Sequence, residues 1–261
     1  MKYEAIAPCL FGMEATVSFE LKNMGIKVLN VSDGRVTFEG DAFEIVRANL
    51  SLRTAERVLI KVGEFKAYSF EQLYQGILKL PFENYIPKDA EFPISKAKSI
   101  NSKLFSKSDI QSVAKKAVVE RLKQKHKVQT LPETGALHPI IIFINKDVVE
   151  VTIDTTGPAL HKRGYREKSG GAPIRETLAA FMVMLTPWRE NRTLVDPMCG
   201  SGTILIEAAL YGAGIMPGIN RNFTGENLSF LPKHVWQTER NEALSQEKDV
   251  QFKLKGYDID E

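Results

Sequence analysis

The segment 193–203 (TLVDPMCGSGT) holds the residues whose types and spacing are best suited to bind a small charged ligand. Its beginning is typical of a short strand, and Gly200 and Gly202 then allow a tight turn and a close approach of the backbone to a ligand. A helix is predicted from Thr203, and the amides at its start favour an anionic group. Asp196 ends the strand, and its charge disfavours a pyrophosphate but favours an ammonium group.

Two commoner nucleotide-binding patterns do not fit this segment. The dinucleotide pattern G-x-G-x-x-G would need glycine at position 205, where the chain has Leu205. The phosphate-binding pattern needs a lysine directly after its last glycine, and in this chain no lysine directly follows Gly200 or Gly202. S-adenosylmethionine carries both a carboxylate and an ammonium group at its methionine end, so the segment predicts a site for this cofactor. A glycine-rich turn that binds nothing is the alternative interpretation.

A second candidate segment, residues 252–260 (FKLKGYDID), is a predicted strand that ends in two aspartates. In nucleoside-binding α/β domains, a carboxylate at the end of the next strand accepts hydrogen bonds from the ribose hydroxyls. Asp258 is the better candidate for this role, and Asp260 is its neighbour. The alternative is that these aspartates cap the strand end or are simply solvated.

The elements that must position these residues follow two different patterns. With 261 residues, of which 43% are hydrophobic, the chain is long enough for two domains with separate cores. The first 80 or so residues mix antiparallel strands with capped helices, an α+β pattern, whereas the residues after about 155 open a parallel α/β unit. The predicted strands of these two parts cover residues 2–7, 26–31, 34–39, 56–64 and 193–195, and the predicted helices cover residues 12–24, 42–51, 174–185 and 203–211.

Between these two parts, the sequence predicts two helices and three strands. Each helix is preceded by a serine that has a glutamine three residues later, which is the spacing of a capping box, and Asp41 with Glu44 has the same spacing before the helix at 42–51. The two serine pairs are Ser69 with Gln72 and Ser108 with Gln111. The predicted helices end near residues 80 and 125, and the predicted strands cover residues 92–98, 139–145 and 148–154.

Residues 96–127 form the most basic part of the chain. This stretch holds ten Lys and Arg residues against two acidic ones, whereas the whole chain has 35 Lys and Arg against 32 Asp and Glu. Lys115, Lys116 and Lys123 fall opposite the apolar stripe of a predicted helix, so they are predicted to face solvent together. Such a patch neutralises several phosphates of a nucleic acid. A solvated helix face is the alternative interpretation.

The composition excludes several other classes of protein. The two cysteines, Cys9 and Cys199, lie far apart, and no Cys and His cluster has zinc-ligand spacing, so neither a disulfide-built domain nor a metal site is predicted. No run approaches the roughly 18 apolar residues that span a bilayer, and the N-terminal residues lack the apolar core of a signal peptide. A cytoplasmic protein without membrane association is therefore expected.

Several strings together resemble one known family. Residues 196–203 (DPMCGSGT) look like the first cofactor motif of the THUMP-containing RNA methyltransferases, and residues 48–58 (ANLSLRTAERV) resemble the segment that leads into their THUMP domain. Residues 154–166 (DTTGPALHKRGYR) and 172–180 (APIRETLAA) resemble their domain junction. The resemblance covers nearly the whole chain. It is closest to the bacterial 23S ribosomal RNA guanine-N2 methyltransferases, which are often labelled N6-adenine-specific DNA methylases.

The resemblance implies an organisation and a set of contacts. It implies an α+β N-terminal half, with a ferredoxin-like subdomain over 1–60 and a THUMP RNA-binding domain over 61–155, followed by the start of an α/β Rossmann-like methyltransferase domain over 156–261. It also implies methyl transfer from S-adenosylmethionine to the exocyclic N2 of a guanine in 23S ribosomal RNA. The implied cofactor contacts are Asp196, Pro197, Cys199, Gly200, Ser201, Gly202, Thr203, Asp258, Arg175, Glu176 and Thr177. The implied RNA contacts are Lys96, Lys98, Lys103, Lys107, Lys115, Lys116, Arg163 and Arg166.

One part of the family pattern is missing. The catalytic motif Asn/Asp-Pro-Pro-aromatic, which holds the target amino group and stacks on a base taken out of the RNA, does not occur in these 261 residues. No catalytic residue is therefore assigned, the methyltransferase domain is interpreted as truncated, and methyl transfer by these residues alone is not expected. A tRNA guanine-N2 methyltransferase, an N6-adenine DNA methylase and a non-catalytic RNA-binding module are the open alternatives.

Overall fold

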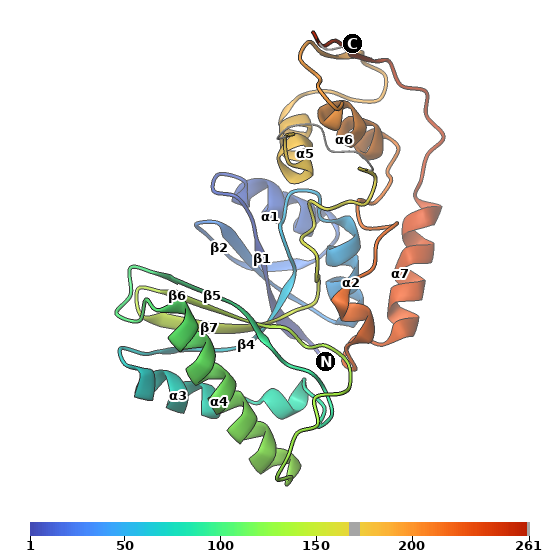
Figure 1. Ribbon diagram of the computed structural model, residues 1–261. Helices are drawn as coiled ribbons and strands as arrows, with labels where there is room; N and C mark the ends of the chain where they lie inside the picture. The colour runs from blue at the N-terminus through green and yellow to red at the C-terminus, as the bar shows by residue number, and fades with distance from the viewer. Residues whose placement is uncertain (167–172, 260–261) are drawn as a thin grey trace. The chain divides into compact units, whose positions relative to one another are not determined.

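The computed structural model describes residues 1–166 and 173–259, and the chain divides into two compact units. The first unit consists of Met1–Val58, Pro158–Phe223 and Lys233–Glu261, and the second of Leu59–Gly157 and Thr224–Pro232. Each unit therefore combines segments that are far apart in the sequence, as the colours of Figure 1 show.

The first unit begins with three antiparallel strands and two helices. These elements are β1 (Tyr3–Pro8), α1 (Glu14–Asn23), β2 (Lys27–Ser32), β3 (Arg35–Gly40) and α2 (Ala42–Ser51). Strand β3 lies between β1 and β2 and pairs antiparallel with both. The turn from β2 to β3 is made by Asp33 and Gly34, and Gly34 adopts a left-handed φ of +71°, a conformation that favours glycine. The predicted ferredoxin-like α+β pattern is confirmed.

Apolar residues on one face of these strands meet the apolar side of α2. Val36 and Phe38 of β3 and Ile45 of α2 are fully buried. Helix α2 begins with the predicted capping box, because the Asp41 carboxylate accepts from the Glu44 amide at 3.1 Å and the Glu44 carboxylate accepts from the Asp41 amide at 2.9 Å.

The later segments of the first unit carry the start of a parallel sheet and three helices. Their elements are α5 (Glu176–Leu185), β8 (Leu194–Asp196), α6 (Thr203–Gly212), α7 (Lys233–Ser245) and β9 (Leu254–Gly256). Strands β8 and β9 pair in parallel, with Asp196 opposite Gly256, which is the arrangement expected of an α/β unit. The sequence did not predict α7, whose buried side chains include Trp236, Glu239 and Ala243.

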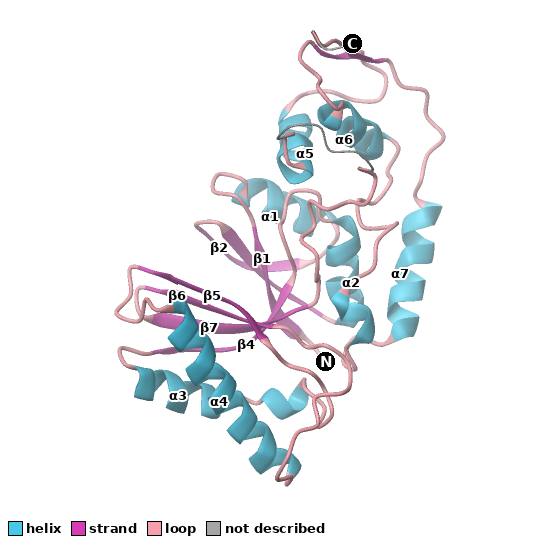
Figure 2. Cartoon of the chain, in the orientation of Figure 1, coloured by secondary structure: helices cyan, strands magenta, loops and turns pink. Residues whose placement is uncertain are grey.

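The second unit contains the strands β4 to β7 and the helices α3 and α4, which lie on one side of these strands (Figure 2). Its main elements are β4 (Leu59–Lys66), α3 (Phe70–Leu78), β5 (Ile94–Ile100), α4 (Lys107–His126), β6 (Ile140–Asn145) and β7 (Val148–Asp154). The strand order is β4-β7-β6-β5, and only the pairing of β5 with β6 is parallel. Short 3-10 helices occur at Phe82–Asn84 and Thr224–Asn227.

Two of the predicted helix caps differ in detail. Helix α4 begins at Lys107, after Ser106, and Gln111 donates its side-chain amide to the carbonyl of Ile94 at 2.7 Å, so Ser108 and Gln111 do not form a capping box. The Gln111 side chain is directed to β5 instead of the helix start, because the Ile94 carbonyl accepts its hydrogen bond. At α3, Ser69 accepts from the Gln72 amide as predicted, but the Gln72 side chain accepts from the amide of Tyr68.

Candidate functional site

The glycine-rich loop between β8 and α6 has the backbone that its sequence requires. Gly200 and Gly202 have φ values of +48° and +72°, a region where a Cβ atom causes strain. A Cβ atom added to either residue would meet nothing within 4 Å, so the backbone is open to a ligand at both positions. Gly202 is the N-cap residue of α6, and the amides of the first turn of that helix have no acceptor within the helix itself.

The end of β9 lies against this loop. The Gly200 amide donates to the Asp258 carboxylate at 2.7 Å, and the Cys199 amide donates to the carbonyl of Tyr257 at 2.9 Å. The Tyr257 amide donates in turn to the carbonyl of Asp196 at 2.9 Å. The structure therefore brings Asp258 to the glycine-rich loop, although it lies 58 positions after Gly200 in the sequence. Asp260 lies outside the described residues.

Asp196 has one carboxylate oxygen whose hydrogen-bonding capacity is not used. Its side chain accepts from the Met198 amide through Oδ1 at 3.2 Å. Its Oδ2 is buried and has no hydrogen-bond partner within the described part of the chain. A buried, unpaired carboxylate oxygen costs free energy, so this position favours a ligand that brings a donor. An ammonium group has the matching charge and donors.

Arg166 connects the starts of the two helices beside the loop. Its guanidinium donates to the Thr203 hydroxyl at 2.8 Å, at the first residue of α6, and lies 3.5 Å from the Glu176 carboxylate, at the first residue of α5. The Ser201 and Thr203 hydroxyls lie 3.2 Å apart. Arg166 was predicted to bind RNA, and in the structure its guanidinium contacts the first residues of α5 and α6 beside the glycine-rich loop.

The three residues at the start of α5 do not share one environment. Arg175 is exposed, whereas Glu176 is 5% exposed and Thr177 is fully buried. Thr177 donates its hydroxyl to Glu56 at 3.3 Å. Thr177 therefore has no exposed surface with which to contact a ligand, and its contact holds α5 in place.

Three family models match the chain in succession. Residues 4–59 match the RlmL ferredoxin-like domain, residues 67–154 match the THUMP domain, and residues 163–261 match the RMKL-like methyltransferase domain. A protein of Bacillus subtilis (strain 168) named "Putative RNA methyltransferase YpsC" is 46% identical over 244 residues. The match covers 93% of this chain and 63% of that protein, so the chain spans less than two thirds of the relative's length.

The chain is also similar in fold and in sequence to solved structures of proteins named as methylases or methyltransferases. A structure named "a possible methylase from Clostridium difficile 630" is 50% identical, with a TM-score of 0.96, and the match covers 100% of this chain and 69% of that one. The chain belongs to the THUMP-containing methyltransferase family. The structure of SMU.472, "a putative methyltransferase complexed with SAH", is 43% identical, with a TM-score of 0.94, and the match covers 99% of this chain and 69% of that one.

In this member of the THUMP-containing methyltransferase family, Arg163 is a buried structural residue. It is 4% exposed, and its guanidinium donates to the carbonyls of Leu160 at 2.6 Å and Arg53 at 2.5 Å. Its Nε atom lies 3.4 Å from the Glu207 carboxylate. This burial contradicts the prediction that Arg163 contacts RNA, because a phosphate has no access to a guanidinium in this position.

Glu207 is a buried residue that the sequence analysis missed. It lies on α6, one helical turn after Thr203, and is fully buried. It accepts from the Tyr165 hydroxyl at 3.0 Å, and burial together with this carboxylate raises the pKa of Tyr165. A glutamate among the apolar residues of α6 (TILIEAALYG) was the available signal, because a buried acid needs a partner.

The basic stretch 96–127 does not act as one patch. Lys115 forms an ion pair with Glu133 at 2.7 Å and lies 3.6 Å from the centre of the Phe92 ring, and Arg121 pairs with Glu83 at 2.5 Å. These two cations are therefore largely neutralised within the second unit. The other predicted RNA contacts of this stretch are exposed: Lys96, Lys98, Lys103, Lys107 and Lys116.

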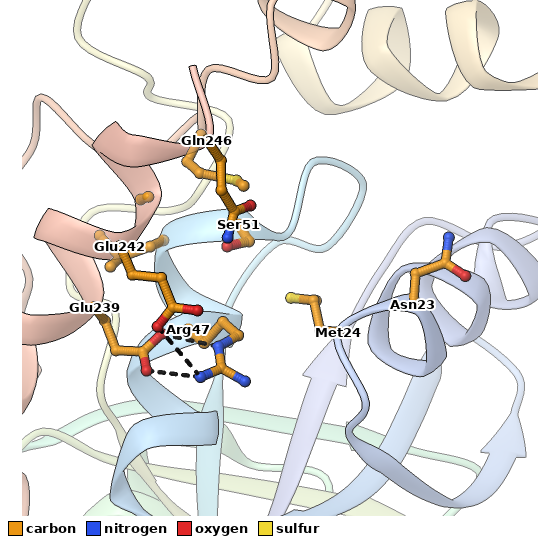
Figure 3. A pocket seen from close by; sticks show the side chains of 10 residues that line it. Asn23, Met24, Arg47, Ser51, Glu239, Glu242 and Gln246 are labelled. Carbon is orange, nitrogen blue, oxygen red and sulfur yellow. Dashed lines mark hydrogen bonds and ion pairs between the residues drawn. The ribbon is translucent and has the colours of Figure 1, made fainter. Parts of the chain in front are cut away.

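A cavity of about 210 Å³ in the first unit lies between α2 and α7 (Figure 3). Arg47 reaches from α2 to the buried carboxylate of Glu239 through two hydrogen bonds of 2.8 and 2.9 Å, and lies 3.9 Å from Glu242. The cation and the two carboxylates satisfy one another, so we interpret this cluster as the connection between the two helices.

The described residues contain no group of three or more His, Cys, Asp or Glu side chains that could hold a metal ion. Among the same described residues, no helix has the length and apolar character needed to cross a membrane.

Proposed function

We propose that this chain supplies the cofactor-binding and RNA-binding parts of an RNA methyltransferase that uses S-adenosylmethionine. We further propose that its target is the exocyclic N2 of a guanine in 23S ribosomal RNA. One observation carries the cofactor assignment: the Asp258 carboxylate and a buried, unpaired oxygen of Asp196 meet at the same open glycine-rich loop. The SMU.472 relative, whose structure contains SAH, supports it.

The residues of this loop fit the different parts of the cofactor. Asp196 Oδ2 would accept from the ammonium group, and the amides at the start of α6 would donate to the carboxylate. Asp258 would accept from the ribose hydroxyls. The cofactor supplies a methyl group activated by its sulfonium charge, and the residues of this chain bind it and fix its orientation. Arg166 contributes indirectly, because it holds the Thr203 hydroxyl.

The cofactor site is tested by replacing Gly202 with aspartate. A side chain at Gly202 enters the open loop and adds a negative charge where the ligand carboxylate would lie, so we expect no measurable binding of S-adenosylmethionine in isothermal titration calorimetry. Gly25→Asp is the matched control, because Gly25 has a similar φ of +76° and similarly open surroundings but lies in the turn after α1. Unchanged affinity in Gly202→Asp, or equal loss in both variants, would refute the site.

The RNA target requires a test of the product. The THUMP and methyltransferase matches, and a relative named as a putative RNA methyltransferase, support RNA as the substrate. The choice of ribosomal RNA rests on the resemblance of the sequence strings to the 23S ribosomal RNA methyltransferases. Ribosomal RNA from a strain that lacks the intact gene should gain N2-methylguanine when it is incubated with the full-length protein and S-adenosylmethionine. Mass spectrometry locates the new methyl group. Methylation of tRNA or of adenine in duplex DNA, with no change in ribosomal RNA, would refute the guanine assignment in 23S RNA.

A further inference from the structure

An open groove of about 460 Å³ lies in the second unit, between the end of β4 and helix α3. Two aromatic side chains, Phe65 and Tyr68, line it, together with the cations Lys66 and Lys79 and the amide side chain of Gln75. Aromatic surface bordered by lysines matches the two parts of a nucleotide, because a base stacks on a ring and a phosphate is attracted to an ammonium group.

One aromatic wall of the groove is fixed in place by a glycine. A Cβ atom built onto Gly76 of α3 would lie 2.1 Å from the ring of Phe65, so the ring packs directly on the helix backbone. Any larger residue at position 76 would displace this ring. Tyr68 forms the exposed part of the aromatic surface, because 46% of the residue is accessible to solvent. The groove therefore has one ring packed against the helix backbone and a second, accessible ring beside it.

A lysine from a different loop reaches the exposed ring. Lys103 Nζ lies 5.1 Å from the centre of the Tyr68 ring, which is within the range of a cation–π interaction. Lys103 comes from the connection between β5 and α4, and Tyr68 from the connection between β4 and α3. The strand register explains why they meet: Lys66 pairs with Val148, and Ile100 pairs with Asn145, at one end of the sheet.

The turn between β6 and β7 holds the two loops together. The Asp147 carboxylate accepts from the Lys103 amide at 2.7 Å, and the Asp147 carbonyl accepts from the Ala67 amide at 2.9 Å. The Asp147 amide donates to the hydroxyl of Ser102 at 3.0 Å. One residue thus fixes both loops, and Figure 1 shows the ends of β4 and β5 on the same side as this turn.

The same connection carries a further exposed ring. Phe105 is 80% exposed and lies two residues after Lys103, just before α4. An exposed apolar patch that is rimmed by polar residues marks an interaction site. The acidic residue at the groove, Glu64, lies 3.3 Å from Lys61, so its charge is partly neutralised by a neighbour on its own strand.

We propose that this groove binds an unpaired nucleotide of the RNA, with its base stacked on Tyr68 and its flanking phosphates near Lys66, Lys79 and Lys103. The inference rests on the proposed function, because it assumes that RNA is the partner of the second unit. It adds that the RNA is recognised here as a single strand, since a base in a duplex has no free face to stack on a side chain.

The test compares Tyr68→Ala and Tyr68→Phe in the full chain, using fluorescence anisotropy with single-stranded and duplex RNA oligonucleotides. We expect Tyr68→Ala to weaken single-strand binding about fivefold or more, because one stacking side chain is lost. We expect Tyr68→Phe to retain the binding of the unmodified chain, because the ring is kept. Duplex binding should not change. Lys103→Ala should lower the salt dependence of single-strand binding by about 0.7 logarithmic units, whereas Tyr68→Ala should leave this slope unchanged.

The matched control is Phe19→Ala, which removes a ring that is 54% exposed on α1 of the first unit. Equal single-strand affinity of Tyr68→Ala and Phe19→Ala would overturn the inference, as would equal losses of Tyr68→Ala on single-stranded and duplex RNA. If the unmodified chain binds neither form of RNA, the RNA part of the proposed function fails as well. If it binds RNA and Tyr68→Ala has no effect, only the groove assignment fails.

Discussion

Replacing Glu207 with alanine tests whether the buried ion pair stabilises α6, the helix that begins at the glycine-rich loop. Glu207 lies on α6 and accepts from Tyr165, and its Oε1 atom is 3.4 Å from Arg163 Nε. The side chains of Arg163 and Glu207 are 2% and 0% exposed, so solvent does not screen the pair. The variant would leave a buried guanidinium without its counter-charge.

The magnitude follows from what each group loses. Removing one partner of a buried ion pair typically costs about 3–5 kcal/mol of unfolding free energy. Arg163 would keep its hydrogen bonds to the carbonyls of Leu160 and Arg53, which favours the lower end of this range. Tyr165 would lose its acceptor, at a cost of about 1 kcal/mol. We therefore expect Glu207→Ala to lower the free energy of unfolding of the first unit by about 3–4 kcal/mol.

Urea unfolding followed by tryptophan fluorescence measures this loss. Both tryptophans of the chain, Trp188 and Trp236, belong to the first unit, so the signal reports on that unit. Glu242→Ala is the control, because Glu242 is 51% exposed and lies 3.9 Å from Arg47, and it should change stability by less than about 0.5 kcal/mol.

A second variant distinguishes a lost charge partner from a lost side chain. Combining Arg163→Met with Glu207→Leu removes both charges and keeps apolar volume, so it should recover at least half of the stability lost in Glu207→Ala. If Glu207→Ala costs no more than the Glu242 control, the ion pair does not stabilise the unit. If the double variant is less stable than Glu207→Ala, the loss comes from packing and the charge argument is wrong.

Two further predictions concern the buried His138 and the close contact of Gly256 with Cys199. Burial lowers the pKa of His138 below its usual value of about 6.5, so stability should fall as pH drops from that value toward the lowered folded-state pKa. His138→Phe should remove this part of the pH dependence in urea titrations, and an unchanged profile would contradict it. At Gly256, a Cβ atom would lie 2.8 Å from Cys199 Sγ, so Gly256→Ala should cost about 1–3 kcal/mol and weaken cofactor binding in calorimetry. Cys199→Ala should restore part of both losses, and no recovery would place the clash elsewhere.

Much of the fold could be predicted because its signals are local. The capping box of Asp41 and Glu44, the turn at Gly34 and the glycine-rich loop each depend on a few adjacent residues. The meeting of this loop with Asp258 was also predictable, because parallel strands place their carboxyl ends at one edge of a sheet. The bounds of most helices and strands differ from the prediction by only a few residues.

The errors arose where a distant partner decides the role of a charge. Arg163 lies in a basic string with Lys162 and Arg166, yet its partner Glu207 is 44 residues away. Lys115 was interpreted from its position on a helix, whereas the loop residue Glu133 determines its charge environment. Counting charges along the chain identifies cations but does not identify which of them are already paired.

The groove of the second unit is a candidate site that charge counting along the sequence fails to identify. The string Lys66-Ala-Tyr68 has a modest charge and lies outside the basic stretch, so a count of lysines does not identify it. Only the strand register brings Tyr68 to Lys103, a residue that the charge count did identify. For a single-stranded RNA, the ring beside the lysine is the more specific feature, because stacking distinguishes unpaired bases and charge alone does not. The exposed lysines of this unit are therefore best ranked by the aromatic side chains that they accompany.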